Sequence, residues 1–337
     1  MTDSALARSW RNLVRPYANA STRRSVLQIT TTGMLFLATI AGLLYGLQHE
    51  VWAAFILTVP AAAFQVRLFI IQHDCGHGSF FKGRWANTVL GSALGMVTLT
   101  PYIYWRDRHA HHHATSGNLD RRGVGDITTL TVREYRSLPL WPRLMYRLYR
   151  HPVVMFGIGP AYVFLLRHRI PTGHPLREYR TWLSVLGTNA VLAAALLIVW
   201  QTMGFAVFFL GYAPPFLIAA TAGVWLFYVQ HQFEDAHWER QPRWKFHVAA
   251  LEGCSLYDLP RILHWVTGHI GLHHIHHLSS RIPNYRLREC YDANPEFQRV
   301  RRLSLRDSLN CARLALWDEE RRKLVSFRQA SGGLATS

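Results

Sequence analysis

Charged residues and cysteines are both scarce in this sequence of 337 residues. Asp, Glu, Lys and Arg make up 17% of the chain, against about 25% in ordinary soluble domains. The four cysteines are too few for a disulfide-dense scaffold, and no CxxC pair indicates a zinc knuckle. Hydrophobic residues make up 50% of the chain, which excludes an intrinsically disordered protein. The distribution of the few charged residues along the chain is therefore informative.

Long stretches of the chain have almost no charged residue. Residues 25–49 and 181–233 contain no Asp, Glu, Lys or Arg, and residues 51–72 contain only Arg67. Because a helix rises 1.5 Å per residue, about 20 apolar residues cross a hydrocarbon core of about 30 Å. The 181–233 stretch fits two crossings with a turn near residues 201–204. The sequence therefore predicts four transmembrane helices, over about 26–47, 51–72, 181–200 and 205–230.

Basic residues lie on one side of these spans. Residues 82–150 hold eleven Lys and Arg, whereas the connectors 48–50 and 201–204 hold none. By the positive-inside rule, both termini and both long polar segments face the cytoplasm. The predicted organisation is a cytosolic N-terminal segment (1–25), a membrane-embedded domain (26–290) with cytosolic segments 73–180 and 231–290, and a basic cytosolic C-terminal tail (291–337).

Two shorter apolar stretches, 87–100 and 153–166, are too short to span, and we interpret them as helices lying at the membrane surface. The net charge is +17. Since the basic residues flank bilayer segments, attraction to anionic headgroups accounts for this charge better than nucleic-acid binding does. The predicted fold class is an all-α integral membrane protein with four transmembrane helices and a cytosolic helical cap.

The histidines carry the chemistry. HDCGH follows the second predicted span, and its two imidazoles are four residues apart, on one face of a helix. RHAHHH and GLHHIHH each contain three histidines at i, i+3, i+4 spacing, and YVQHQFED places one more where the fourth span ends. All lie on the predicted cytosolic side. The nine candidate ligands are His73, His77, His109, His112, His113, His231, His273, His276 and His277.

Each motif alone has a simpler explanation, such as packing for the HxxxH pair or an interfacial hydrogen bond for His231. Together the motifs favour metal binding. Nine imidazoles exceed the eight that two closed tetrahedral zinc sites would use, so two ions with open positions fit better. Nearby carboxylates could accept the second ring N–H of these histidines: Asp74, Asp107, Asp120, Glu234 and Asp235.

The sequence resembles the membrane-bound fatty acid desaturase family, in particular its bacterial acyl-lipid, omega-6 (delta-12)-like branch. The shared stretches are HDCGHGSFF, RHAHHHATSGNLDRRGVGDITTLTVREY, WLFYVQHQFED and TGHIGLHHIHHLSSRIPNY, between about residues 70 and 290. The resemblance implies that the nine histidines hold two iron ions. This sequence departs from the family pattern at His269, where this branch usually has an Asn associated with a metal-bound water. His269 is therefore a candidate tenth ligand, a replacement for that water, or a base beside it.

The resemblance implies a reaction that uses O2 and two electrons to introduce a cis double bond into an acyl chain. A methylene has no polar handle, so an apolar tunnel must position the chain. Plausible tunnel walls are Trp182, Phe208, Tyr212, Trp225, Phe227 and Tyr228, and Arg67, Arg106 and Arg108 could receive the headgroup. The expected partners are an acyl-lipid or acyl-thioester, membrane lipids and a separate electron donor such as ferredoxin. The expected location is a bacterial inner membrane.

Two other functions remain open at this point. A lipid or hydrocarbon hydroxylase, or another oxidase of the same fold, would carry the same histidine spacing. A metal transporter or sensor is disfavoured, because its ligands would line a path near the bilayer midplane.

Overall fold

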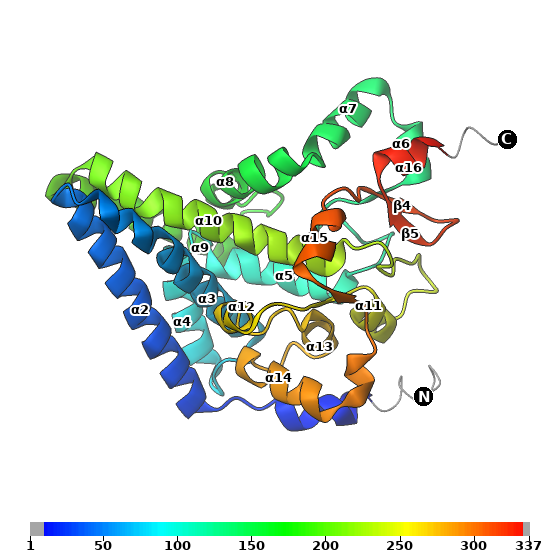
Figure 1. Cartoon of the computed structure of the whole chain (residues 1–337), viewed down its shortest axis with the longest axis horizontal. Coiled ribbons are helices and arrows are strands. Elements are labelled where there is room, and N and C mark those ends of the chain that lie inside the picture. Colours follow the sequence, from blue (N-terminus) through cyan, green and yellow to red (C-terminus); the bar gives the residue numbers. More distant parts are fainter. Residues whose placement is uncertain (1–9, 333–337) are drawn as a thin grey trace.

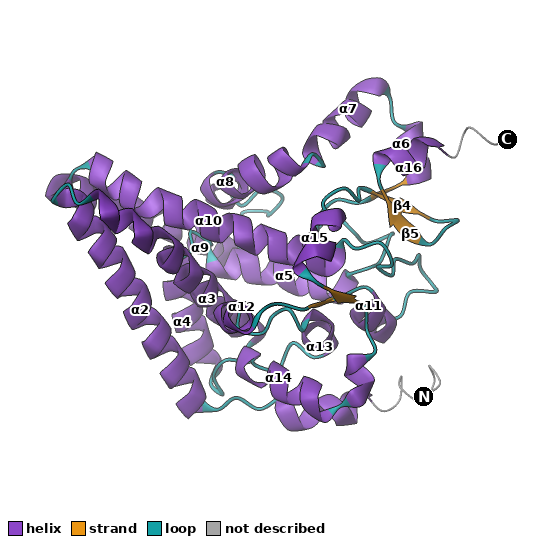
Figure 2. Cartoon of the chain, viewed as in Figure 1, coloured by secondary structure: helices purple, strands orange, loops and turns teal. Residues whose placement is uncertain are grey.

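Helices dominate the computed structural model, which describes residues 10–332 (Figures 1 and 2). Residues 1–9 of the predicted N-terminal segment and 333–337 of the predicted tail lie outside it. Four helical segments are long and apolar enough to cross a membrane, as predicted. They are α2 (Thr22–Gln48), the 3-10 turn η2 (Trp52–Leu57) continued by α3 (Thr58–His77), α9 (Tyr179–Met203) and α10 (Phe205–His231).

The remaining helices are shorter and belong mainly to the polar segments. They are η1 (Arg15–Tyr17), α4 (Arg84–Val97), α5 (Tyr102–Thr115), α6 (Val132–Ser137), α7 (Leu140–Tyr149), the π-helical turn η3 (Val154–Ile158), α8 (Gly159–Leu165), η4 (Arg167–Arg169), α11 (Phe246–Glu252), α12 (Arg261–Val266), α13 (His273–Leu278), α14 (Asn284–Ala293), η5 (Pro295–Gln298), α15 (Leu305–Cys311) and α16 (Phe327–Gly332).

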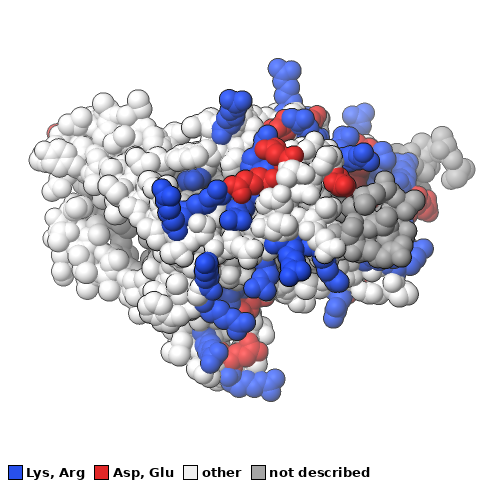
Figure 3. Space-filling view, turned by 90° about the horizontal axis from the view of Figure 1, so that it is seen from below, with Lys and Arg blue, Asp and Glu red and all other residues white. Residues whose placement is uncertain are grey.

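Charge divides the molecule into two parts. In Figure 3 the end formed by the α2–η2 and α9–α10 turns is almost free of Lys, Arg, Asp and Glu, whereas the opposite end carries many of them. The α9–α10 turn is made by Gly204, whose positive φ of 79° suits glycine and lies within the predicted 201–204 turn. The uncharged part is therefore the part that a bilayer can enclose.

The two short apolar stretches form helices that pack against the spans. Helix α4 packs along α3, and the Gln65 Nε2 of α3 donates to the Val97 carbonyl at 3.0 Å. The second stretch forms η3 and α8, which both contact α10. Their location at the membrane surface stays a prediction.

Close packing between α4 and α5 sets the direction in which α5 leaves the membrane region. A Cβ atom on Gly91 would lie 2.2 Å from the ring of Tyr102, so only glycine admits this tyrosine. The Tyr102 hydroxyl then donates to the Cys75 carbonyl of α3 at 2.8 Å. Helix α5 is thereby fixed beside the end of α3, where HDCGH lies.

Two small sheets modify the all-α prediction. The strand β4 (Leu316–Asp318) pairs with β1 (Leu130–Thr131) in parallel and with β5 (Lys323–Val325) antiparallel, and β2 (Leu256–Tyr257) pairs in parallel with β3 (Arg302–Leu303). Strands of two or three residues carry no detectable alternation in sequence. They join the segment after residue 290, which we predicted as a basic tail, to the polar segments before it.

A buried arginine ties this C-terminal segment to α10. Arg150 is 4% exposed, and its guanidinium donates to Tyr228, to Gln232 and to the carbonyls of Thr128 and Leu314 at 2.8–3.2 Å. Hydrogen bonds to a charged group contribute about 1.5–3 kcal/mol each.

We expect Arg150→Met to destabilise the protein by about 3 kcal/mol or more, because methionine removes four hydrogen bonds that a buried charged group donates. Thermal unfolding in detergent, compared with the wild type, measures this loss. Arg299→Gln, at an exposed position, is the control. An unchanged melting temperature for Arg150→Met would show that the network contributes little.

Candidate metal centre

Four helices bring the predicted histidines to one place. His73 and His77 occupy the last turn and a half of α3, which ends at Gly78 with a positive φ of 66°. Helix α5 contributes three histidines from its last two turns, α13 contributes three along its length, and α10 ends at His231. The i, i+3, i+4 spacing thus puts each set on one helix face, as the sequence predicted.

The nine rings fall into two groups, whose candidate ligand atoms lie within 4.8 Å of one another. The five-histidine group contains His73, His77, His109, His113 and His276. The four-histidine group contains His112, His231, His273 and His277. The groups adjoin, since the ring centroids of His113 and His277 are 4.0 Å apart and the rings stack.

Ring nitrogens face one another inside each group. The Nε2 atom of His113 lies 3.1 Å from the Nε2 atoms of both His109 and His276. In the other group, the Nε2 atom of His231 lies 3.1 Å from that of His112 and 2.9 Å from that of His273. A neutral imidazole has one N–H and one lone pair, so such clusters match a shared cation better than mutual hydrogen bonding.

Burial favours the neutral form of five of these imidazoles. It lowers the pKa of the His109, His113, His273, His276 and His277 imidazoles well below the ordinary value, and the neighbouring histidines lower each pKa further. Neutral imidazole is the form that binds a metal. The His277 Nε2 atom is buried without a partner among the described residues, which also suits a metal ion. The donor set therefore fits two transition-metal ions, one with five and one with four nitrogen donors.

One predicted carboxylate and one unpredicted carboxylate lie beside the rings. Asp74 Oδ1 is 3.5 Å from His73 Nδ1, and its Oδ2 accepts hydrogen bonds from the Asn284 backbone and side chain at 2.6 and 2.8 Å. Asp126 contacts Nδ1 of His112 and thereby directs Nε2 of that ring into the four-histidine group. Sequence reasoning missed Asp126 because it lies in a loop, where helical spacing gives no signal.

The other predicted carboxylates form ion pairs with basic residues. Asp120 binds Arg240 at 2.8 Å, and Asp107 binds Arg106 at 3.2 Å. Glu234 and Asp235 both bind Lys323, at 3.1 and 3.5 Å. Lys323 belongs to β5, more than eighty residues later in the chain. Proximity in sequence therefore misidentified these residues as partners of the histidines.

His269, a candidate tenth ligand, replacement for the water or base beside it, lies in neither group. It has a positive φ of 58°, its amide donates to the His264 carbonyl at 2.8 Å, and its ring stacks on His264 at 5.6 Å. Burial, with smaller effects from His264 and nearby arginines, lowers its pKa to about 4. Helix α13 begins only at His273, so the helical spacing that would align the two rings does not extend back to residue 269.

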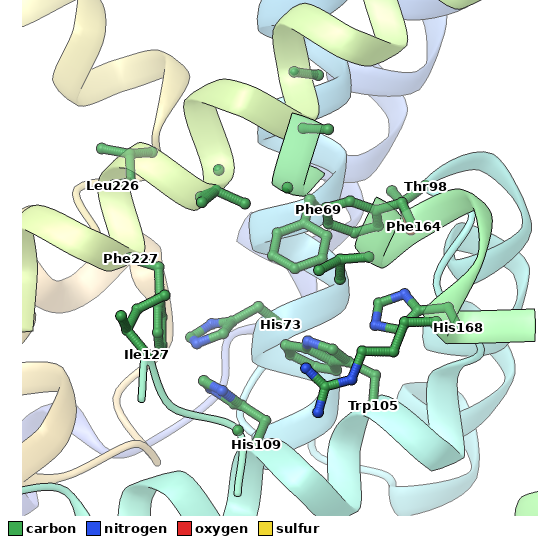
Figure 4. Close-up of a pocket in the computed structure, with 18 of the residues that line it drawn as sticks. Phe69, His73, Thr98, Trp105, His109, Ile127, Phe164, His168, Leu226 and Phe227 are labelled. Carbon is green, nitrogen blue, oxygen red and sulfur yellow. The ribbon is translucent and has the colours of Figure 1, made fainter. Parts of the chain in front are cut away.

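An apolar cavity of about 440 Å³ reaches the histidines, within the range of about 300–1,000 Å³ typical of ligand sites. His73 and His109 lie in its wall (Figure 4). His273 also lines it. A series of ring contacts leads away from them: His109 stacks on Trp105 at 4.7 Å, Trp105 meets Phe69 at 5.5 Å, and Phe164 lies 6.5 Å from Phe69 and 5.2 Å from His168. The cavity wall is therefore aromatic from His109 to His168.

The predicted tunnel walls are largely on other faces. Of the six aromatics, Phe227 alone is among the described residues that line the cavity. On α10 the lining positions are 216, 219, 220, 223, 224, 226, 227 and 230, which recur every three to four residues along the helix. Trp225 instead donates to the Tyr257 hydroxyl at 3.2 Å, and Tyr212 donates to the Val97 carbonyl at 2.5 Å. Arg67, a predicted headgroup ligand, packs on Trp265 and bonds its carbonyl.

Comparison with known proteins gives a consistent result. The family model described as fatty acid desaturase matches residues 50–307. A fatty acid desaturase of Bacillus subtilis is 43% identical over 97% of this chain and 94% of its own length. Two proteins of Synechocystis, an sn-1 acyl-lipid omega-3 desaturase (ferredoxin) and an sn-1 oleoyl-lipid 12-desaturase, are 31% and 29% identical over 67% and 68% of this chain. Those alignments cover 63% and 64% of the two relatives.

Proposed function

The chain belongs to the fatty acid desaturase family, and we propose from this premise that it uses two iron ions and O2 to insert a cis double bond into the acyl chain of a membrane lipid. The family makes it a membrane oxidoreductase. The nine histidines are proposed as the iron ligands. The observation that supports this most directly is the convergence of nine imidazoles in two adjoining groups beside an apolar cavity.

The donor set supports iron in preference to closed zinc sites. Five and four nitrogen donors, with no carboxylate in either group, leave room for open positions at a six-coordinate ion. Bound there, a pair of iron ions supplies O2 reduction, with overall conversion of O2, two electrons, two protons and the two hydrogens of adjacent methylenes to two waters. Asp126 orients the His112 ring through its contact with Nδ1.

The cavity positions the acyl chain and excludes water from the site. Its wall near His73 and His109 is formed by side chains such as Trp105, Phe69 and Phe227. These side chains exclude water and restrict the chain to a few conformations, which brings two chosen methylenes beside the ions. Regioselectivity then depends on cavity shape, since methylenes offer no hydrogen-bonding group.

Electrons and substrate must reach the site from outside the chain. The charged part of the surface in Figure 3 carries many Lys and Arg, which would attract an acidic donor such as ferredoxin. The names of the two Synechocystis relatives support both a ferredoxin donor and an acyl-lipid substrate. We place the metal centre and both termini on the cytoplasmic side of a bacterial inner membrane, as the distribution of basic residues favours.

Gas chromatography with mass spectrometry of lipids from a host expressing the chain with its donor tests this function. A desaturase gives a new fatty acid two mass units lighter than its precursor. A product with an added oxygen would instead indicate a hydroxylase, and an unchanged profile would contradict both.

We expect Asp126→Asn to lower iron affinity by about 10–100-fold, the usual cost of losing an outer carboxylate partner. The amide can no longer stabilise the tautomer of His112 whose Nε2 lone pair faces the metal. Iron retention against a graded chelator measures the effect. Asp120→Asn, which alters only the contacts with Arg240 and Gln241, is the control. Equal iron retention in both variants would assign Asp126 no part in metal binding.

A further inference from the structure

Across Trp105 from the histidines, the cavity wall holds a cluster of polar side chains that the proposed reaction does not use. We call Tyr104, Arg108, Arg167 and His168 the cationic end; all four line the cavity. In Figure 4, His168 lies across the ring of Trp105 from His73 and His109. An apolar channel with a positively charged end has the polarity of an amphiphile with an anionic head.

Two segments build this end. Tyr104 and Arg108 are one turn apart on α5, and the Arg108 guanidinium lies 5.7 Å from the Tyr104 ring centroid. Arg167 and His168 belong to η4, directly after α8, and the His168 and Tyr104 ring centroids are 6.2 Å apart. The four side chains therefore converge although about sixty residues separate the two pairs.

The positive charge here is not neutralised within the described part of the chain. Neither Arg108 nor Arg167 forms an ion pair with a described carboxylate, and the nearby Glu178 binds His174 at 2.6 Å. Arg169 is held by the Leu99 carbonyl and by Asn189, at 2.5 and 3.0 Å, so it is already occupied. Two guanidinium groups thus remain available to an anion.

Two buried polar atoms at the same end also lack partners. The Tyr104 hydroxyl belongs to a side chain that is 1% exposed, and His168 Nδ1 to one that is 8% exposed. A buried polar group without a hydrogen bond costs about 1–3 kcal/mol. Two such atoms beside two unpaired arginines indicate a site for a polar ligand, because internal packing alone would leave these groups without partners.

We propose that the cationic end binds the phosphodiester head of a glycerophospholipid whose acyl chain enters the cavity. This inference rests on the proposed function for its substrate chain and adds the class of head. Arginine binds phosphate oxygens by paired N–H groups, the Tyr104 hydroxyl donates to a further oxygen, and His168 Nδ1 meets a polar group of the head. Tyr104 and Arg108 precede His109 on α5, so the head fixes which carbons of the chain reach the histidines.

Lipid binding to the iron-loaded full chain in detergent, followed by native mass spectrometry, tests the proposal without turnover. The probes are phosphatidylglycerol, an uncharged galactosyl diacylglycerol with the same chains, and inorganic phosphate. We expect Arg167→Gln to weaken phosphatidylglycerol binding about tenfold and to leave galactolipid binding unchanged. Arg299→Gln, which removes an exposed arginine elsewhere, should bind both lipids like the wild type.

Tyr104→Phe provides a second, structural readout. Because the hydroxyl is buried and unpartnered, its removal should leave the melting temperature of lipid-free protein equal or higher, while phosphatidylglycerol binding weakens several-fold. A lower melting temperature with normal lipid binding would assign the hydroxyl a structural role and overturn the proposal.

Three further results would also overturn it: equal loss of both lipids in Arg167→Gln, normal phosphatidylglycerol binding in that variant, or inorganic phosphate binding as tightly as the lipid. The two proposals fail separately. A wild type that binds phosphatidylglycerol but forms no double bond contradicts only the desaturation. If the wild type forms double bonds while the Arg167→Gln variant binds phosphatidylglycerol normally, only the proposed head site is contradicted.

Discussion

Replacing His112 with alanine is expected to abolish double-bond formation, with a loss well beyond the roughly 100-fold that removal of an outer partner of a ligand causes. His112 is 2% exposed and its Nε2 lies 3.1 Å from that of His231. Without it the four-histidine group keeps three donors. The Asp126 carboxylate, which contacts His112, would also remain in the protein without its partner.

Two measurements separate loss of metal from loss of fold. Iron content per chain should fall from about two to about one, while the melting profile in detergent stays cooperative. His111→Ala is the matched control, because His111 is the adjacent residue on α5 and is exposed. It should keep both iron and activity. If His112→Ala formed product at the rate of His111→Ala, the nine-histidine assignment would be wrong.

Helical periodicity explains why so much of this site could be predicted. His109, His112 and His113 needed only to be on a helix for their rings to share a face, and the same holds for α13. Uncharged length likewise predicted the four spans, because crossing a bilayer sets a minimum number of apolar residues. Both arguments use a local repeat, which the sequence displays directly.

Contacts between distant segments could not be predicted in this way. The pairing of Glu234 with Lys323 depends on a β-strand of three residues, and Asp126 reaches His112 through a loop. His269 illustrates a different limit. It lies four residues before His273, but the backbone between them has not yet entered the helix, so the spacing does not align the two rings. Spacing predicts geometry only where the secondary structure is continuous.

The same reasoning applies to the channel. A list of large aromatics on α10 selected Tyr212, Trp225 and Tyr228, yet the face that lines the cavity is made partly of small residues such as Ala219, Ala220 and Gly223. Space for a ligand requires side chains that do not fill it. The small residues Ala219, Ala220 and Gly223, within about one turn of each other, were therefore the informative signal on this helix.

Gly223→Leu is expected to inactivate the enzyme while making the helix more stable. Gly223 lies inside α10 and lines the cavity, and a Cβ atom added there meets nothing within 4 Å. Leucine removes the helix penalty of glycine, about 0.8–1 kcal/mol, so the melting temperature should not fall. Its side chain would occupy the channel, and we expect kcat/KM for a long acyl chain to fall about 100-fold or more.

Iron content distinguishes a blocked channel from damage to the metal centre. The Gly223→Leu protein should retain two irons per chain, unlike His112→Ala. Gly187→Leu is the matched control, because Gly187 lies inside α9, is exposed, and also has open space at its Cβ position. Its outward position predicts full activity. Because the two changes are chemically identical, normal activity in both would mean that the acyl chain does not run through the cavity beside α10.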